Sequence, residues 1–450
     1  MEHKTLQNIM KEETIPKAML ILAAPSMATM LCLAFFHIAD TFFLTRINFF
    51  AAGAAGILFT IQNIIQSIGF TCGMGGGSRI AMLIGEEEEE MAGEYALTAM
   101  VLTVVLGGVL TGLSLWKLPT LLVFLGADNE MMVYGMVYGR YLCLSAPGIC
   151  LSYTLQNLLR AEGGAKQVLI SVAGSCVLGV FLEFMLTIVF HFGVGGAGVS
   201  YLMYVIIQCI FLLYWYFSGQ TMVRVTWKKL LYSINFVRCL EIIRLGFASF
   251  VRQSIGSVAN TVQNRMLSGY GAGAVSAMAI GFKLYSVLFA LIVGYIQGYS
   301  PVAGYFYGEG NCGKLKRSCS HAIKAGVVFH VFFGIIAFFF SRNVLQLFIR
   351  EIQYLNLVDS WMRYQSILLP FTMTALLCSG LYQAMGKVKQ AVLLASLRQG
   401  MVYLPGIYIC SYLWGFMGVV YIQPIADGIS FLVCLFYLIK FFRQPNYQKT

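Results

Sequence analysis

The feature that most constrains this chain is a succession of long apolar runs separated by short polar connections. Most runs reach roughly 20 residues or more, the length that an α-helix needs to cross the hydrocarbon core of a bilayer. Only 11% of the 450 residues are charged, whereas a soluble protein carries about 25%. Because backbone in lipid must satisfy its own hydrogen bonds, these runs predict an all-α integral membrane protein.

The runs predict twelve transmembrane helices, with boundaries at polar or glycine-rich connections. We place the spans at residues 17–44, 51–72, 94–116, 133–157, 167–190, 194–217, 240–266, 274–300, 320–341, 360–384, 391–412 and 415–441. The N-terminus is polar and leads directly into the first span, so we expect no cleavable signal peptide. The glycine-rich segment 73–80 lacks the ending of a phosphate-binding loop, and it predicts either close helix packing or a helix break.

Basic residues gather in alternate connections, which all fall on one side of the predicted membrane. They are Lys4, Lys11, Lys17, Arg160, Lys166, Arg224, Lys228, Lys229, Arg238, Lys314, Lys316, Arg317, Lys387, Lys389, Lys440, Arg443 and Lys449. The connections on the other side are sparse, with Arg46, Lys117, Arg342 and Arg350 as their main basic residues. The positive-inside rule therefore predicts a multi-pass inner-membrane protein with both termini in the cytoplasm. It also accounts for the net charge of +11 without a nucleic-acid partner.

The two halves of the chain repeat each other at one constant offset. The offset that takes Pro147 to Pro370 also aligns RAEGGAKQ (160–167) with QAMGKVKQ (383–390). Six spans in each half give both halves the same orientation, with a pseudo-two-fold axis along the membrane normal. We divide the chain into an N-terminal lobe (1–217), a cytoplasmic linker with an amphipathic surface helix (218–239) and a C-terminal lobe (240–450).

Ionisable residues inside the N-terminal spans are the first candidates for function, because buried charge is costly in a membrane. Asp40 and His37 lie in the first span, and Glu183 lies in the fifth. By helix rise both acids fall in the half of the membrane nearer the outside, so they can share a cavity and hold a proton or sodium ion. A structural charge pair and a hydrogen-bonded packing histidine remain the alternatives.

The C-terminal half carries a different polar set. Gln253 and Asn260 fall on one face of the seventh span, while Arg252, Lys283 and Asp427 suggest a salt-bridged cluster that is either structural or part of a substrate path. Further cavity candidates are Gln62, Gln66 and Gln297. The many aromatic and methionine side chains would suit a cavity for flat organic cations, although most of them serve packing.

Several segments together resemble the multidrug and toxic compound extrusion (MATE) transporters, most closely the MepA-like and DinF-like bacterial members. The carriers of the resemblance are Pro25, IADTFF (38–43), GGGSRIAMLIG (75–85), LLRAEGGAK (158–166), GVGGAGVS (193–200), QGYSPVAGYFYGEGN (297–311), YQAMGK (382–387) and QPIADGIS (423–430). Their order and spacing cover nearly the whole chain.

The resemblance implies two six-helix bundles forming a V, and export of cationic or amphipathic drugs in exchange for protons or sodium. It makes Asp40 and Glu183 the coupling acids and Pro25 a helix-bending residue. The chain departs from the family's fifth-span pattern, since Gly179 replaces an asparagine and Phe184 a proline, and only Ser200 or Tyr201 supplies the sixth-span hydroxyl. Sodium bound by Asp40, Glu183 and Ser200 remains an alternative, but these differences from the family pattern favour the proton as the coupling ion.

We therefore expect a monomeric antiporter that works by alternating access, with no cofactor and no resident metal. An alternative on the same fold is a flippase or exporter of a lipid-linked or anionic substrate, motivated by Arg252, Arg265 and Lys283. An enzyme is disfavoured, because neither an HExxH zinc motif nor a GxSxG nucleophile elbow occurs.

Overall fold

The computed structural model describes residues 6–47, 49–125, 129–219, 221, 235–270, 272–349 and 351–444. Within these ranges the chain is helical, without a strand, and it makes twelve passes after a short N-terminal helix α1 (Leu6–Glu12). The first six passes are α2 (Ile15–Ile47), α3 (Phe49–Gly85), α4 (Glu89–Phe124), α5 (Asn129–Leu144) with α6 (Ala146–Ala161), α7 (Ala165–Phe184) with η1 (Met185–Val189), and α8 (Gly193–Phe217). The second six are α10 (Phe236–Ser268), α11 (Ala272–Gly308), α12 (Cys312–Leu345), α13 (Ile352–Ala384), α14 (Val388–Ser396) with η2 (Leu397–Tyr403) and α15 (Leu404–Trp414), and α16 (Phe416–Arg443).

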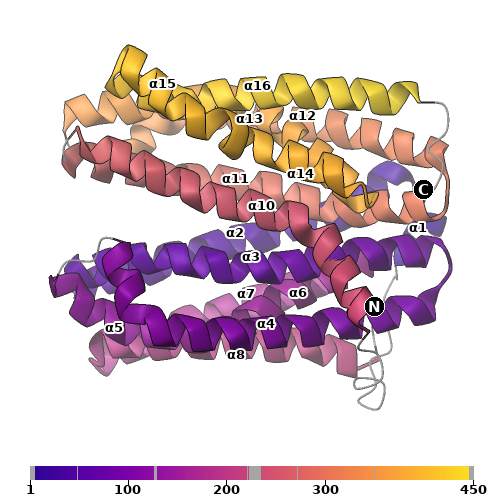
Figure 1. The fold of residues 1–450 in the computed structure, drawn as a ribbon, viewed down its shortest axis with the longest axis horizontal. Helices are drawn as coiled ribbons and strands as arrows, with labels where there is room; N and C mark the ends of the chain where they lie inside the picture. Colours follow the sequence, from indigo (N-terminus) through magenta and orange to yellow (C-terminus); the bar gives the residue numbers. More distant parts are fainter. Residues whose placement is uncertain are drawn as a thin grey trace.

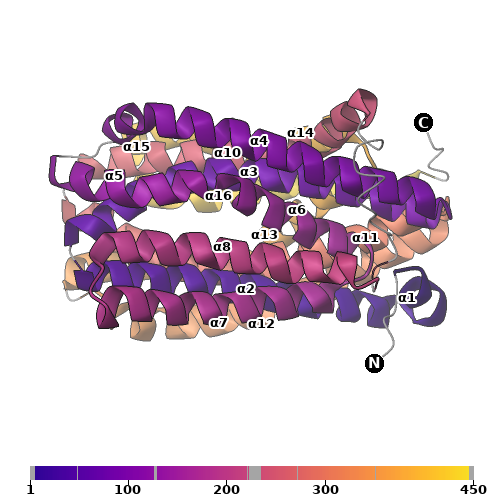
Figure 2. The same ribbon diagram turned by 90° about the horizontal axis from the view of Figure 1, so that it is seen from below.

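Ten of these passes are long and apolar enough to cross a membrane by composition alone, counted over the described residues. The other two are the pass formed by α5 and α6 and the pass formed by α10. The first is interrupted at Ser145, shortly before Pro147, which cannot donate a backbone hydrogen bond. Figure 2 shows α5 and α6 as separate segments of the N-terminal half. Helix α10 carries the polar stripe expected from the sequence, and this lowers its hydropathy.

The helices form two bundles side by side, as predicted (Figure 1). Helices α2 to α8 make the N-terminal bundle and α10 to α16 the C-terminal bundle. The described chain begins and ends at the same end of the molecule, here called the terminal end, as twelve passes require. The predicted surface helix of the linker lies almost wholly in residues 222–234, outside the described part of the chain. The division at 217 and 240 therefore stays a prediction.

The second and eighth spans are longer than predicted. Helix α3 continues from the expected end at residue 72 to Gly85, and α11 continues from residue 300 to Gly308. The glycine-rich segment 73–80 is continuous helix, so the helix-break interpretation is wrong and the close-packing interpretation is confirmed. Both extensions approach the terminal end.

Glycines in these extensions bring the two bundles into backbone contact. A Cβ atom on Gly75 of α3 would lie 2.0 Å from the carbonyl oxygen of Ile242 in α10. Across the same crossing, a Cβ atom on Gly246 would lie 1.8 Å from the carbonyl oxygen of Thr71. Only glycine permits this approach, which is how small residues drive helix association in membranes.

The internal repeat reproduces this contact in a second crossing, between α11 and α2. At the offset of the repeat, Gly298 is the counterpart of Gly75, and Ala23 is that of Gly246. A Cβ atom on Gly298 would lie 2.4 Å from the Cα atom of Ala23. Two crossings related by the pseudo-two-fold axis therefore help to hold together the halves of the bundles nearer the terminal end.

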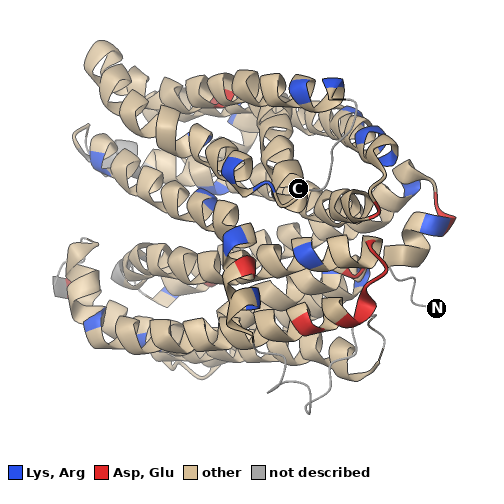
Figure 3. Ribbon diagram, turned by 45° about the vertical axis from the view of Figure 1, so that its right-hand side comes forward, with Lys and Arg blue, Asp and Glu red and all other residues tan. Residues whose placement is uncertain are grey.

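Charged side chains reinforce the same end of the molecule. Figure 3 shows Lys, Arg, Asp and Glu gathered mostly there. Arg79 of α3 forms an ion pair with Glu241 of α10 at 3.3 Å, and Arg238 of α10 pairs with Glu94 of α4. Both pairs join the two bundles across the first crossing.

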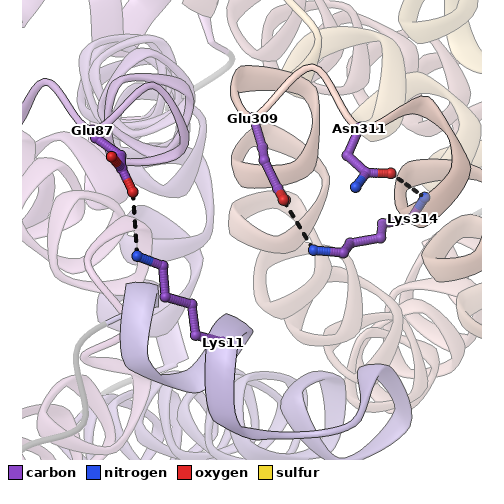
Figure 4. A network of polar contacts seen from close by, with 5 residues as sticks. All are labelled: Lys11, Glu87, Glu309, Asn311 and Lys314. Carbon is purple, nitrogen blue, oxygen red and sulfur yellow. Dashed lines mark hydrogen bonds and ion pairs between the residues drawn. The ribbon is translucent and has the colours of Figure 1, made fainter.

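Ion pairs within each bundle also occupy the terminal end, and Figure 4 shows two of them from close by. Lys11 of α1 contacts Glu87 in the turn before α4 at 3.2 Å, and Lys314 contacts Glu309 at 2.9 Å. The side chain of Asn311 accepts a hydrogen bond from the backbone N–H of Lys314 and so caps α12.

Candidate functional site

The two predicted N-terminal acids meet in the structure. Asp40 near the end of α2 and Glu183 near the end of α7 lie within hydrogen-bonding reach of each other. The hydroxyl of Tyr138 on α5 donates to Oδ1 of Asp40 at 3.3 Å. Oε1 of Glu183 is buried without a partner. Two carboxyl groups this close cannot both be charged without strong repulsion, so the arrangement favours a proton shared between them.

An aromatic frame surrounds the carboxyl pair. Phe36 stacks on Tyr204 with ring centroids 3.9 Å apart, and Tyr138 and Tyr201 lie 6.4 Å apart. Gln62, a predicted cavity residue, donates to the hydroxyl of Tyr201 at 2.8 Å. The tyrosines combine apolar faces with hydroxyl groups, so they can contact an organic cation while orienting the acids.

The local sequence around Glu183 explains its departure from the family pattern. A Cβ atom on Gly179 would lie 2.9 Å from the Phe36 ring and 3.0 Å from the Tyr204 ring. Phe36 and Tyr204 therefore occupy the space where an asparagine would stand. The helix turns wider over η1, directly after Phe184, and Thr187 there donates to the carbonyl oxygen of Glu183 at 2.5 Å.

A cation from the other bundle faces this site. Lys283 of α11 is exposed and interacts electrostatically with Asp40 and with His37. The His37 ring packs edge-on against Phe36 and Phe59 at 5.8 and 6.1 Å. Lys283 thus lies within electrostatic range of Asp40.

The predicted cluster of Arg252, Lys283 and Asp427 is wrong, because Asp427 pairs with another cation. Asp427 of α16 instead accepts a hydrogen bond from Nε of Arg398 at 2.5 Å, and Gln423 donates to the same oxygen at 3.1 Å. Arg252 donates to the hydroxyl of Ser249 at 3.3 Å. The buried Arg398–Asp427 pair has the character of a structural ion pair within the C-terminal bundle.

Arg398 and Tyr138 were not among the residues that the sequence pattern singled out. Arg398 falls inside the predicted eleventh span, so the rule that singled out Asp40 applied equally to it. Tyr138 carried no such signal, because tyrosine is common in spans and only the fold places its hydroxyl on Asp40.

The remaining candidates are dispersed over both bundles. Gln66 and Gln297 are buried, Gln253 is half-buried and Asn260 is exposed. The Ser200 hydroxyl donates to the carbonyl oxygen of Ala197 at 2.8 Å within its own helix. Pro25 lies inside an uninterrupted α2, where Thr29 donates to its carbonyl oxygen at 2.8 Å.

Two further observations bear on ligands. Among the described residues no three His, Cys, Asp or Glu side chains come together as a metal site. An apolar groove of about 560 Å³ lies on the C-terminal bundle, at the end opposite to the termini. Its lining is Tyr364, Trp414, Met417, Tyr421, Pro424 and Ile425.

Comparisons with known proteins agree with this architecture. The sequence profile of the MatE family matches residues 25–185 and 248–409, two copies whose starting points differ by the offset of the internal repeat. The chain is 26% identical to the multidrug export protein MepA of Staphylococcus aureus (strain MRSA252), over 93% of this chain and 92% of that protein.

Solved structures share the fold. A MOP superfamily transporter from Pyrococcus furiosus, whose reverse pocket polarity is taken to suggest a different function, superposes with a TM-score of 0.89 at 22% identity, over 99% of this chain and 100% of that chain. The outward-facing conformation of a multidrug resistance MATE family transporter gives 0.87 at 23% identity, over 96% and 97% of the two chains. The repeated match, the two six-pass bundles and the shared fold lead to one conclusion: the chain belongs to the MatE family of multi-pass membrane transporters.

Proposed function

We propose that this transporter is an antiporter that exports organic cations in exchange for protons. The observation that carries the proposal is the Asp40–Glu183 carboxyl pair, held within one bundle and faced by aromatic rings. Such a pair attracts a cation when it has lost its shared proton and releases the cation when it regains one. The 26% identical relative is a multidrug export protein, and this supports drug-like cations as the substrate class.

The residues around the pair favour a proton over sodium. Sodium prefers several oxygen ligands, as hard cations do. Gly179 provides no side-chain oxygen, and Phe36 and Tyr204 fill the space beside it. The Ser200 hydroxyl is engaged with its own helix. Two carboxyl groups with a tyrosine hydroxyl are sufficient to hold and pass a proton.

Lys283 gives the exchange an internal competitor. Its ammonium group interacts with Asp40 from the opposite bundle, so an arriving organic cation must displace this interaction. Protonation of Asp40 would then release the substrate and reset the site. Lys283 couples that charge change to the C-terminal bundle, which must move relative to the N-terminal bundle for alternating access.

The orientation follows from the loop charges. The terminal end carries most of the charged side chains (Figure 3), and the positive-inside rule places it in the cytoplasm. The glycine crossings lie toward this end, and the acids lie toward the other. We infer an arrangement sealed on the cytoplasmic side, in which a proton from outside reaches Asp40.

A second candidate is transport of an anionic or lipid-linked substrate. Arg252 favours it, because its guanidinium forms no ion pair with a carboxylate in the described part of the chain and donates only to Ser249. Dye efflux in proteoliposomes separates the two candidates. Inhibition by organic cations, lost in Asp40→Asn, supports the first. Inhibition by organic anions, lost in Arg252→Gln, supports the second.

A further inference from the structure

A small polar cavity lies between the two bundles near the terminal end. Its volume of about 10 Å³ corresponds to one water molecule or one ion of similar size. The N-terminal bundle contributes Gly73, Met74, Gly77, Ser78, Asn157, Arg160 and Ala161, and the C-terminal bundle contributes Gln297, Ser300 and Pro301. The cavity exists only where the two bundles meet.

The charge in this cavity is unpaired. Arg160, at the end of α6, is 2% exposed. Its Nη2 donates to Oε1 of Gln156 at 3.4 Å, while Nε and Nη1 are buried without a partner. It forms no ion pair with any carboxylate in the described part of the chain. A buried guanidinium without a counter-charge is costly, and evolved proteins normally pair it.

Other groups in the cavity are also unpartnered. The hydroxyl of Ser78 is buried without a hydrogen bond, and so is Oε1 of Gln297. The hydroxyl can donate, and a half-turn of the Gln297 amide, which exchanges its oxygen and nitrogen, would direct an N–H into the same space. Together with the guanidinium they form a set of donors that lacks an acceptor.

The internal repeat supplies a contrast to Arg160. Its counterpart at the offset of the repeat is Gln383. This neutral side chain is buried and satisfied, because its Nε2 donates to the carbonyl oxygen of Leu245 and to Ser249 at 3.2 and 2.9 Å. The repeated framework therefore does not itself require a cation at this position. The positive charge is a separate feature of the N-terminal copy.

We propose that this cavity binds one small monatomic anion, with chloride as the physiological class of ligand. The guanidinium of Arg160 supplies the charge and two N–H donors, and Ser78 and Gln297 complete the shell. Because Gln297 comes from the opposite bundle, the anion binds fully only when the crossings of α3 with α10 and of α2 with α11 are closed. Chloride would therefore stabilise the conformation that is sealed at the terminal end.

Thermal unfolding of the purified full-length protein in detergent tests the proposal. Sodium chloride and sodium bromide are titrated against sodium gluconate at constant ionic strength, because gluconate is too large for the cavity. We expect a saturable rise in the unfolding temperature of about 2 °C in the halides. Arg160→Gln should abolish the rise, whereas Lys117→Gln, which removes an exposed cation stacked on Trp116, should retain it.

A second variant keeps the proposal testable if Arg160→Gln does not fold. Ser78→Ala retains the charge and removes one donor, so the half-saturating chloride concentration should rise about fivefold. In bromide-soaked crystals, an anomalous peak beside the Arg160 guanidinium is expected. Equal unfolding temperatures in chloride and gluconate, a halide effect that survives in Arg160→Gln, or unchanged chloride affinity in Ser78→Ala would each overturn the proposal.

Discussion

Gly246 of α10 lies so close to α3 that a Cβ atom at this position would stand 1.8 Å from the carbonyl oxygen of Thr71. The two bundles therefore touch through their backbones at this crossing. The repeat-related crossing has an alanine, Ala23, at the position of Gly246, and there Gly298 and Gly294 of α11 provide the space. A side chain added at Gly246 should therefore disturb the seal between the bundles.

The change Gly246→Ala tests this crossing. The added methyl group meets backbone atoms, so the helices must separate. We expect the unfolding temperature of the purified protein to fall by several degrees and substrate transport to be largely lost. Gly112→Ala is the matched control, because a Cβ atom there would meet no atom within 4 Å. If both variants behave like wild type, the backbone contact does not seal the bundles.

The pair of Arg398 and Asp427 should act as one structural unit. Asp427→Asn leaves the guanidinium buried without its counter-charge, so the free energy of unfolding should fall by about 3–5 kcal/mol. The double variant Arg398→Met with Asp427→Leu removes both charges and should lose much less. Denaturant unfolding in detergent measures the free energy of unfolding of the single and the double variant. Equal losses in the single and double variants would show that the pair is not coupled.

Gly179→Asn would restore the side chain expected from the family pattern. The structure predicts that it does not create sodium coupling, because Phe36 and Tyr204 already occupy that space. We expect a lower unfolding temperature and weaker transport under a proton gradient, with no gain under a sodium gradient. Sodium-driven uptake by this variant would contradict the geometry of the site.

Lys283→Gln removes the cation that competes for Asp40. The apparent KM for a cationic dye should fall by about threefold to tenfold, because the substrate no longer displaces a resident charge. Lys283→Arg keeps the charge and serves as the control. Initial rates of dye transport in proteoliposomes give the apparent KM of each variant. An unchanged or higher KM in Lys283→Gln would separate this residue from the substrate site.

Much of the architecture was predictable because bilayer thickness dictates span length and the repeat dictates symmetry. The pairing of Asp40 with Glu183 also followed, since two costly acids at similar depth in one bundle have few other partners. The partners predicted for Asp427 in the C-terminal half, Arg252 and Lys283, were wrong. Helix rotation decides whether Asp427 faces Lys283 or Arg398, and hydropathy is almost insensitive to rotation when a helix is apolar on every side.

The glycine crossings illustrate the same limit. The segment 73–80 indicated close packing, but its partner could not be known from local sequence. Gly75 meets Ile242, which lies in the other half of the chain. Only the three-dimensional arrangement shows that these glycines join the two bundles. The same holds for Arg160, whose buried and unpaired state depends on contacts from α11.

The most direct test of the central claim is dye counterflow in proteoliposomes under an imposed proton or sodium gradient, with wild type compared with Asp40→Asn. One elementary charge moving through 100 mV is worth about 2.3 kcal/mol, so a single coupled proton gives a measurable driving force. We expect that a proton gradient alone drives ethidium movement in wild type and fails to do so in Asp40→Asn at equal incorporation. Movement driven only by sodium, or an Asp40→Asn variant that transports as well as wild type under the proton gradient, would contradict it.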